Sequence, residues 1–152
     1  MTAAGQIQPV EILLVEDNPG DVRLTKEALK EAGVINNLTV ATDGAEALSF
    51  LRRQKDDAKT PTPNLILLDL NLPKRDGHAV LAEIKADLKL KRIPVIILTT
   101  SQNEQDIHKS YNLHANCYVT KPGDLHQFIN VIKTIKDFWL GIVNLPKNEQ
   151  FS

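Results

Sequence analysis

Asp69 directly follows an aliphatic run, Leu65 to Leu68, that lies between Pro63 and Pro73. Four consecutive large aliphatic residues are typical of a strand that is buried on both faces, as strands of parallel sheets are. In open α/β sheets the ligand crevice lies beyond the carboxyl ends of the strands, which is where this pattern puts Asp69. Because aspartate at such a place most often forms a turn or a helix cap, the other strand ends must decide whether Asp69 has a chemical role.

Polar side chains follow other predicted strands as well: Glu16 and Asp17 after the first, Thr99 and Thr100 after the fourth, and Lys121 after the fifth. These strand ends open on one edge of a parallel sheet, so the side chains should converge in one cleft. Three carboxylates packed together would raise one another's pKa values unless a hard cation neutralises them, and Mg²⁺ prefers such oxygen ligands. Taken singly, each residue also has a structural interpretation as a cap, a strand residue or a solvated charge.

Acids, a metal ion, a lysine and a hydroxyl can together hold a phosphoryl group, whose transfer depends mainly on positioning and charge neutralisation. An aspartate can itself accept the group and form a covalent aspartyl phosphate. The sequence therefore predicts a phosphoryl-binding site at this edge of the sheet.

The elements that must position these residues alternate along the chain. Strands are predicted at Val10–Glu16, Leu38–Ala41, Leu65–Leu68, Pro94–Thr99 and Asn116–Thr120. Helices are predicted from Pro19 to Gly33, around Ala45–Leu51, along the stripe Leu81, Ile84 and Leu88, and at Glu104–Asn112 and Leu125–Trp139, with Arg52–Pro63 as a surface loop. Parallel neighbours need crossover connections, so this alternation predicts an α/β fold with a five-stranded parallel sheet and helices on both faces.

Length and composition limit the number of domains, the kinds of partner and the compartment that we expect for this protein. The 152 residues predict one domain at 10–140, an N-terminal extension at 1–9, and a tail at 141–152 that is too short for an output domain. With 18 basic and 19 acidic residues, the formal charge of -1 gives no attraction for nucleic acid or an anionic membrane. Without an apolar run long enough to cross a bilayer, without a signal peptide and with one cysteine, Cys117, we expect a cytoplasmic protein.

Four motifs, LLVEDN, LILLDLNLPKRDG, PVIILTTS and YVTKP, resemble those of the receiver domain of two-component response regulators, over nearly the whole span from Val10 to Trp139. The resemblance implies a flavodoxin-like receiver fold with strand order 2-1-3-4-5. It also implies that the protein is not an enzyme acting on other molecules. The reactions that it would catalyse are its own Mg²⁺-dependent phosphorylation and its own slow dephosphorylation.

By position, the resemblance assigns a role to each residue of the site. Asp69 is the phosphoacceptor, and Thr99 and Lys121 contact the phosphoryl group. The metal ligands are Asp69, Asp17, Glu16 acting through water, and the main-chain carbonyl of Asn71, with Mg²⁺ as the ion and Mn²⁺ or Ca²⁺ as substitutes. Thr99 and Tyr118 form a switch in which Tyr118 turns inward after phosphorylation, and the Lys121–Pro122 bond is cis.

Peripheral segments, among them VIILTTSQNEQDI, HANCYVTKP and DFWLGIVNLP, resemble the small stand-alone response regulators that are paired with bacterial phytochromes. Under this resemblance, the phosphoryl donor is the phosphohistidine of a sensor histidine kinase, possibly a phytochrome. No bound organic cofactor is expected in this chain.

The last predicted helix carries more apolar surface than its own core needs. One ridge holds Leu125, Ile129, Ile132 and Trp139, and a second holds Phe128, Val131, Ile135, Phe138 and Ile142. A surface helix needs an apolar stripe of about 100°. The excess predicts a homodimer through Phe128 and Phe138, on the surface of fourth helix, fifth strand and fifth helix that this family commonly uses. The alternative is that the tail from Leu140 to Pro146 folds back over it.

Three other functions stay open at this point. An aspartyl-phosphate hydrolase also uses an Asp at a strand end, but it needs a second Asp two residues on, where this chain has Asn71. A flavodoxin-like cofactor module would share the strand order, but EDNPGD is acidic where an anionic cofactor would lie. The third is a receiver-like interaction module that works without phosphorylation.

Overall fold

A single parallel sheet forms the centre of the computed structural model, which describes residues 9–33, 35–56, 62–141 and 143–146. Its strands are β1 (Val10–Val15), β2 (Asn36–Ala41), β3 (Leu65–Leu68), β4 (Val95–Thr99) and β5 (Cys117–Thr120). They pair in the order β2-β1-β3-β4-β5, and every pair is parallel. The predicted α/β fold and strand order are confirmed.

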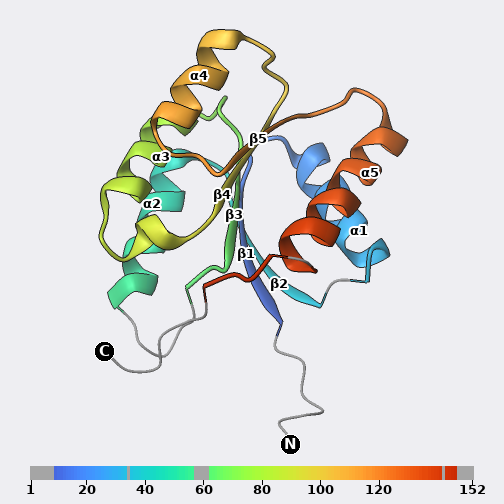
Figure 1. The fold of residues 1–152 in the computed structure, drawn as a ribbon, viewed down its shortest axis with the longest axis horizontal. Helices are drawn as coiled ribbons and strands as arrows, with labels where there is room; N and C mark the ends of the chain where they lie inside the picture. The colour runs from blue at the N-terminus through green and yellow to red at the C-terminus, as the bar shows by residue number, and fades with distance from the viewer. Residues whose placement is uncertain (1–8, 34, 57–61, 142, 147–152) are drawn as a thin grey trace, which may run out of the picture.

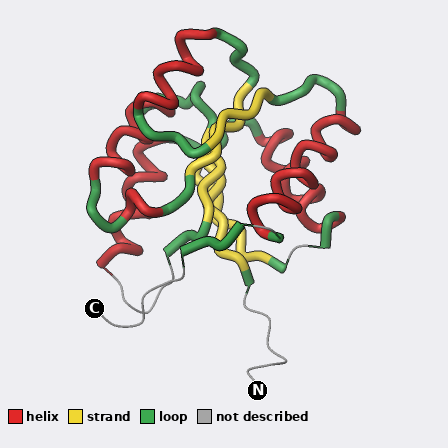
Figure 2. The backbone as a smooth tube through the Cα atoms, viewed as in Figure 1, coloured by secondary structure: helices red, strands yellow, loops and turns green. Residues whose placement is uncertain are grey.

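Helices cover both faces of the sheet (Figure 1). One face carries α1 (Pro19–Glu31) and α5 (Leu125–Ile135), which is followed by a π-helical turn, η2 (Lys136–Leu140). The other carries α2 (Gly44–Asp56), α3 (Gly77–Ala86), the 3₁₀ turn η1 (Leu90–Arg92) and α4 (Glu104–Asn112). Figure 2 shows the strands as the middle layer between these two groups. Within the described part of the chain, no helix combines the length and the apolar character that a membrane span requires.

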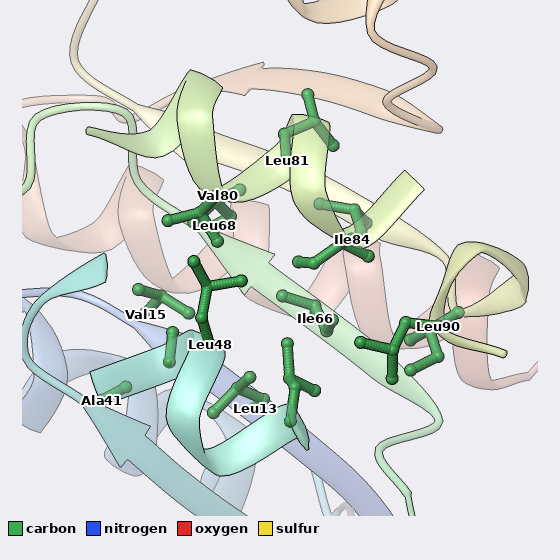
Figure 3. Close-up of a cluster of buried hydrophobic side chains, with 14 of the residues drawn as sticks. Leu13, Val15, Ala41, Leu48, Ile66, Leu68, Val80, Leu81, Ile84 and Leu90 are labelled. Carbon is green, nitrogen blue, oxygen red and sulfur yellow. The ribbon is translucent and has the colours of Figure 1, made fainter. Parts of the chain in front are cut away.

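Alternate residues of each strand divide the core between the two faces. Leu13, Ile66 and Ile97 belong to the cluster beneath α2 and α3, part of which Figure 3 shows. Ile12, Leu67 and Ile96 belong to the cluster beneath α1 and α5. Both sets are almost completely buried, which explains why β3 and β4 are continuous aliphatic runs and not alternating ones.

Capping side chains fix the points at which four helices begin. The side-chain oxygens of Asn18, Asp76, Asn103 and Asp124 accept hydrogen bonds from backbone N–H groups in the first turns of α1, α3, α4 and α5. Each cap satisfies an N–H group that has no partner within its helix. The loops from strand to helix therefore end at defined residues, and these loops border the candidate site.

The predicted ends of the second and third helices were wrong. Helix α2 continues to Asp56, five residues into the predicted loop, with the side chain of Arg53 donating to the Ser49 hydroxyl one turn earlier (3.1 Å). Helix α3 ends at Ala86, because Asp87 leaves the helical conformation and its carboxylate caps the next turn. Leu88, predicted on the buried stripe, is consequently 77% exposed, and Leu90 fills the core in its place.

The prediction that Phe128 lies at an interface was also wrong. Phe128 is only 3% exposed and, with Ile132 and Ile135, forms the stripe of α5 that packs on the sheet. Leu125 is half exposed, whereas Ile132 of the same predicted ridge is buried. Phe138 is 49% exposed, as an interface residue must be, and Ile142 lies outside the described residues.

Gly77 lets helix α3 begin directly behind the end of β3. A Cβ atom at this position would lie 2.4 Å from the carbonyl oxygen of Asp69 and 2.5 Å from the Cα of Leu70. We expect Gly77→Ala to lower the free energy of unfolding, measured by urea denaturation, by about 2 kcal/mol. The control is Gly123→Ala, whose added Cβ would meet nothing within 4 Å and should change stability by less than about 0.5 kcal/mol. Equal effects of the two variants would contradict the close packing at Gly77.

Candidate functional site

Backbone hydrogen bonds carry the sheet one residue beyond three of its strands. The N–H of Glu16 donates to the Ala41 carbonyl (2.9 Å), that of Asp69 to the Val15 carbonyl (3.1 Å), and that of Lys121 to the Thr99 carbonyl (2.7 Å). Each functional residue is therefore held by the neighbouring strand. The predicted convergence of Glu16, Asp69, Thr99 and Lys121 at one edge is observed.

The ammonium group of Lys121 lies at the centre of this edge and is buried. It donates to one carboxylate oxygen of Glu16, to Asp21 Oδ2 at 2.9 Å, and to Asp69 Oδ2 at 3.1 Å. Three carboxylates thus account for the three donors of the ammonium group. In the structure the Lys121–Pro122 bond is trans, so the implied cis bond was wrong: Lys121 reaches the site with the peptide isomer that X–Pro bonds normally favour.

Asp21 was not predicted from the sequence. It is the third residue of α1, and its side chain is 27% exposed. An acid at this helix position normally reaches back to the N–H of the capping residue. Here the N–H of Asn18 donates to Glu16 Oε2 instead (3.2 Å), which leaves the Asp21 carboxylate free for Lys121. The available signal was an acidic residue in the first turn of the helix that follows the Glu16–Asp17 pair.

Three carboxylates have the arrangement of a divalent cation site. Oxygens of Glu16, Asp17 and Asp69 all lie within 4.8 Å of one another. Glu16 (3% exposed) and Asp69 (7%) are buried, whereas Asp17 is exposed and lines, with Glu16, a cavity of about 350 Å³ beside α1 and β2. The donor set is all oxygen, and the only cation that contacts it within the described residues is Lys121. This chemistry fits Mg²⁺ or Mn²⁺.

Burial and hydrogen bonding have opposite effects on the two charged partners. Burial raises the pKa of Glu16 to about 7, with a further contribution from the charge of Asp69, although the hydrogen bond from Lys121 acts in the other direction. Burial alone would lower the pKa of Lys121, but its hydrogen bonds to Glu16 and Asp21 outweigh that effect and raise it. Lys121 therefore stays a cation, and proton loss from Glu16 near neutral pH adds negative charge to the site.

The hydroxyl of Thr99 is the unsatisfied group of the site. Thr99 is 0% exposed, and its Oγ1 has no hydrogen-bond partner among the described residues. A buried hydroxyl without a partner is costly, so such a group calls for an explanation. An incoming oxygen-rich anion would supply the missing partner.

The remaining predicted residues lie close to this edge. The backbone N–H of Asn71 donates to Asp69 Oδ1 (3.3 Å), while its carbonyl remains a predicted metal ligand. Tyr118 is partly buried, and its hydroxyl donates to the carbonyl of Ser101 (2.9 Å), two residues after Thr99. The switch role of Tyr118 remains a prediction.

The fold and the arrangement of the site are those of a receiver domain. The chain belongs to the response regulator receiver domain family, whose model matches residues 12–133. The resemblance inferred from the sequence motifs is confirmed.

Two cyanobacterial response regulators are similar over almost their full length. Response regulator Rcp1 of Synechocystis sp. is 51% identical over 138 residues, which are 91% of this chain and 94% of Rcp1. The crystal structure of its Mn²⁺-bound form has a TM-score of 0.84 and covers 91% of this chain and 99% of that chain. The structure of the phosphorylated cyanobacterial phytochrome response regulator RcpA, also 51% identical, has a TM-score of 0.86 and covers 92% and 100%.

The raised pKa of Glu16 predicts a pH-dependent stability in metal-free protein. Between the ordinary value of 4.5 and about 7, the folded state binds more protons than the unfolded state. The free energy of unfolding should therefore fall as pH rises through this window, by on the order of 2 kcal/mol more in the natural protein than in Glu16→Gln. Urea denaturation with EDTA measures the difference. Glu27→Gln removes the same charge at an exposed position, and this control should keep the fall in the free energy of unfolding with rising pH. If Glu16→Gln keeps that fall as well, the raised pKa does not belong to Glu16.

Proposed function

We propose that this protein is a response regulator that accepts a phosphoryl group on Asp69 from a sensor histidine kinase. The observation that carries the proposal is the position of Asp69: its buried carboxylate lies against Lys121 Nζ (3.1 Å) and within 4.8 Å of the Glu16 and Asp17 oxygens. A carboxylate is a sufficient nucleophile once the charge of the incoming phosphoryl group is neutralised.

The residues of the site divide the work of this transfer. One Asp69 oxygen forms a bond to phosphorus while the bond from phosphorus to the donor histidine breaks, and the released imidazole nitrogen keeps the electron pair and takes a proton. The ammonium of Lys121 and the unpaired hydroxyl of Thr99 donate to the phosphoryl oxygens. Asp17, Asp69, the Asn71 carbonyl and, through water, Glu16 would hold a Mg²⁺ ion, which would supply further charge neutralisation.

The donor and the compartment are the more specific parts of the proposal. RcpA is a phytochrome response regulator with 51% identity to this chain, which supports a phytochrome-type kinase as the donor. We place the reaction in the cytoplasm, the kind of reducing compartment in which an unpaired cysteine such as Cys117 is stable.

Intact-mass spectrometry after incubation with acetyl phosphate tests the phosphoacceptor. We expect one phosphoryl adduct that requires Mg²⁺, is absent from Asp69→Asn, and persists in Asp137→Asn, a matched variant at an exposed surface position. A folded, metal-binding protein without an adduct would favour the phosphorylation-independent interaction module. Fast, continuous release of phosphate without accumulation of the adduct would favour the hydrolase.

We also propose that the exposed face of η2 forms a homodimer contact. Phe138 is about half exposed and packs edge-to-face on Trp139, with ring centroids 5.6 Å apart, so an aromatic side chain is available at this surface. Exposed aromatic residues of this kind are common at the centres of interfaces.

Sedimentation velocity tests this contact. Phe138→Asp should shift the protein toward monomer by at least about tenfold in dissociation constant, because a buried charge opposes association. Leu88→Asp, an equally drastic change at an exposed leucine on another surface, should leave the association state unchanged. Dimers of unaltered stability in the Phe138 variant would count against the proposed surface.

A further inference from the structure

Among the described residues, Asp21 has Lys121 as its side-chain partner at the site. Its Oδ2 lies 2.9 Å from the ammonium nitrogen, whereas it is not part of the carboxylate group whose oxygens converge within 4.8 Å. Glu16 and Asp69 differ in this respect, because they belong both to the shell of Lys121 and to the candidate cation site. Lys121 and a divalent cation therefore compete for Glu16 and Asp69 but not for Asp21.

The first turn of α1 holds Asp21 in place from two sides. Its N–H donates to the Asn18 side chain (3.1 Å), and its carbonyl accepts from the hydroxyl of Thr25 (2.8 Å), a residue that is almost fully buried. The diversion of the Asn18 N–H to Glu16 removes the usual partner of an acid at this helix position. The backbone of Asp21 is thus held in place, and its carboxylate is available for Lys121.

We propose that Asp21 is a positioning residue for Lys121, which keeps one carboxylate partner for the ammonium group when a divalent cation occupies Glu16 and Asp69. Without Asp21, cation binding would leave a buried ammonium with no carboxylate that is free of the metal, and an uncompensated buried charge is strongly unfavourable. With Asp21, one donor of Lys121 stays anchored while the other two become available for phosphoryl oxygens. The consequence for phosphoryl transfer rests on the function proposed above; the link between Asp21, Lys121 and the cation does not.

A double-mutant cycle on Mn²⁺ affinity tests this link, with Mn²⁺ titrations followed by electron paramagnetic resonance and no phosphoryl donor present. Asp21→Asn should raise the Mn²⁺ dissociation constant about fivefold in the natural background and less than twofold in the Lys121→Met background. Asp21→Glu keeps the carboxylate and should restore part of the affinity. Glu27→Gln removes the same charge from an exposed part of α1 and should have little effect.

Equal effects of Asp21→Asn in both backgrounds would mean that Asp21 acts on the cation by its charge alone, and would overturn the proposal. A lowered affinity that Asp21→Glu does not restore would also overturn it. Thermal denaturation of each variant checks that α1 remains folded. Because these titrations need no phosphorylation, a missing adduct on Asp69 would refute the proposed function without altering this result.

Discussion

Two buried carboxylates at the ends of β1 and β3 need a compensating positive charge, and most of the site is built around the ammonium group of Lys121, which provides it. Removing an ion from water costs several kcal/mol unless close partners replace the lost hydration. Lys121 meets Glu16, Asp21 and Asp69 from the end of β5, across the full width of β1, β3 and β4. The site therefore exists only when sheet and helix α1 have both formed, which makes the functional geometry a property of the complete fold.

A parallel sheet is well suited to this requirement because its strand ends share one edge. The backbone N–H groups of Glu16, Asp69 and Lys121 extend the hydrogen bonding of the sheet by one residue past the ends of their strands. The backbones that carry these charged side chains are therefore held by the sheet. The core of this sheet consists of continuous aliphatic runs buried on both faces. Charged residues can be accommodated at the ends of these aliphatic runs, where the site begins.

The continuous aliphatic runs of these strands, with polar residues at their ends, explain which features could be predicted from the sequence. The runs ending at Asp69 and Thr99 are bounded by prolines and polar residues, so strands, fold and the converging strand ends were predictable. Asp21 was not, because an acid in a first helical turn normally serves its own helix, and only the structure shows that Glu16 takes over that hydrogen bond. Phe128 was misplaced because several apolar residues on α5 fit either face, and packing alone selects the stripe with Ile132 and Ile135. The prediction that Leu88 lies on the buried stripe of α3 was wrong because Asp87 ends this helix. The Asp87 carboxylate accepts a local hydrogen bond that competes with continuation of the helix.

The hydrogen bond from the Tyr118 hydroxyl to the Ser101 carbonyl connects β5 to the segment that directly follows Thr99. Coupling between two sites is reciprocal in free energy. If Tyr118 acts as the predicted switch, a partner that binds more tightly to one arrangement of this tyrosine must shift the occupancy of the phosphoryl site by the same factor as the phosphoryl group shifts the partner's affinity. Under the predicted switch, the downstream target would be a thermodynamic effector of its own signal, because its binding would change how much of the protein is in the active arrangement.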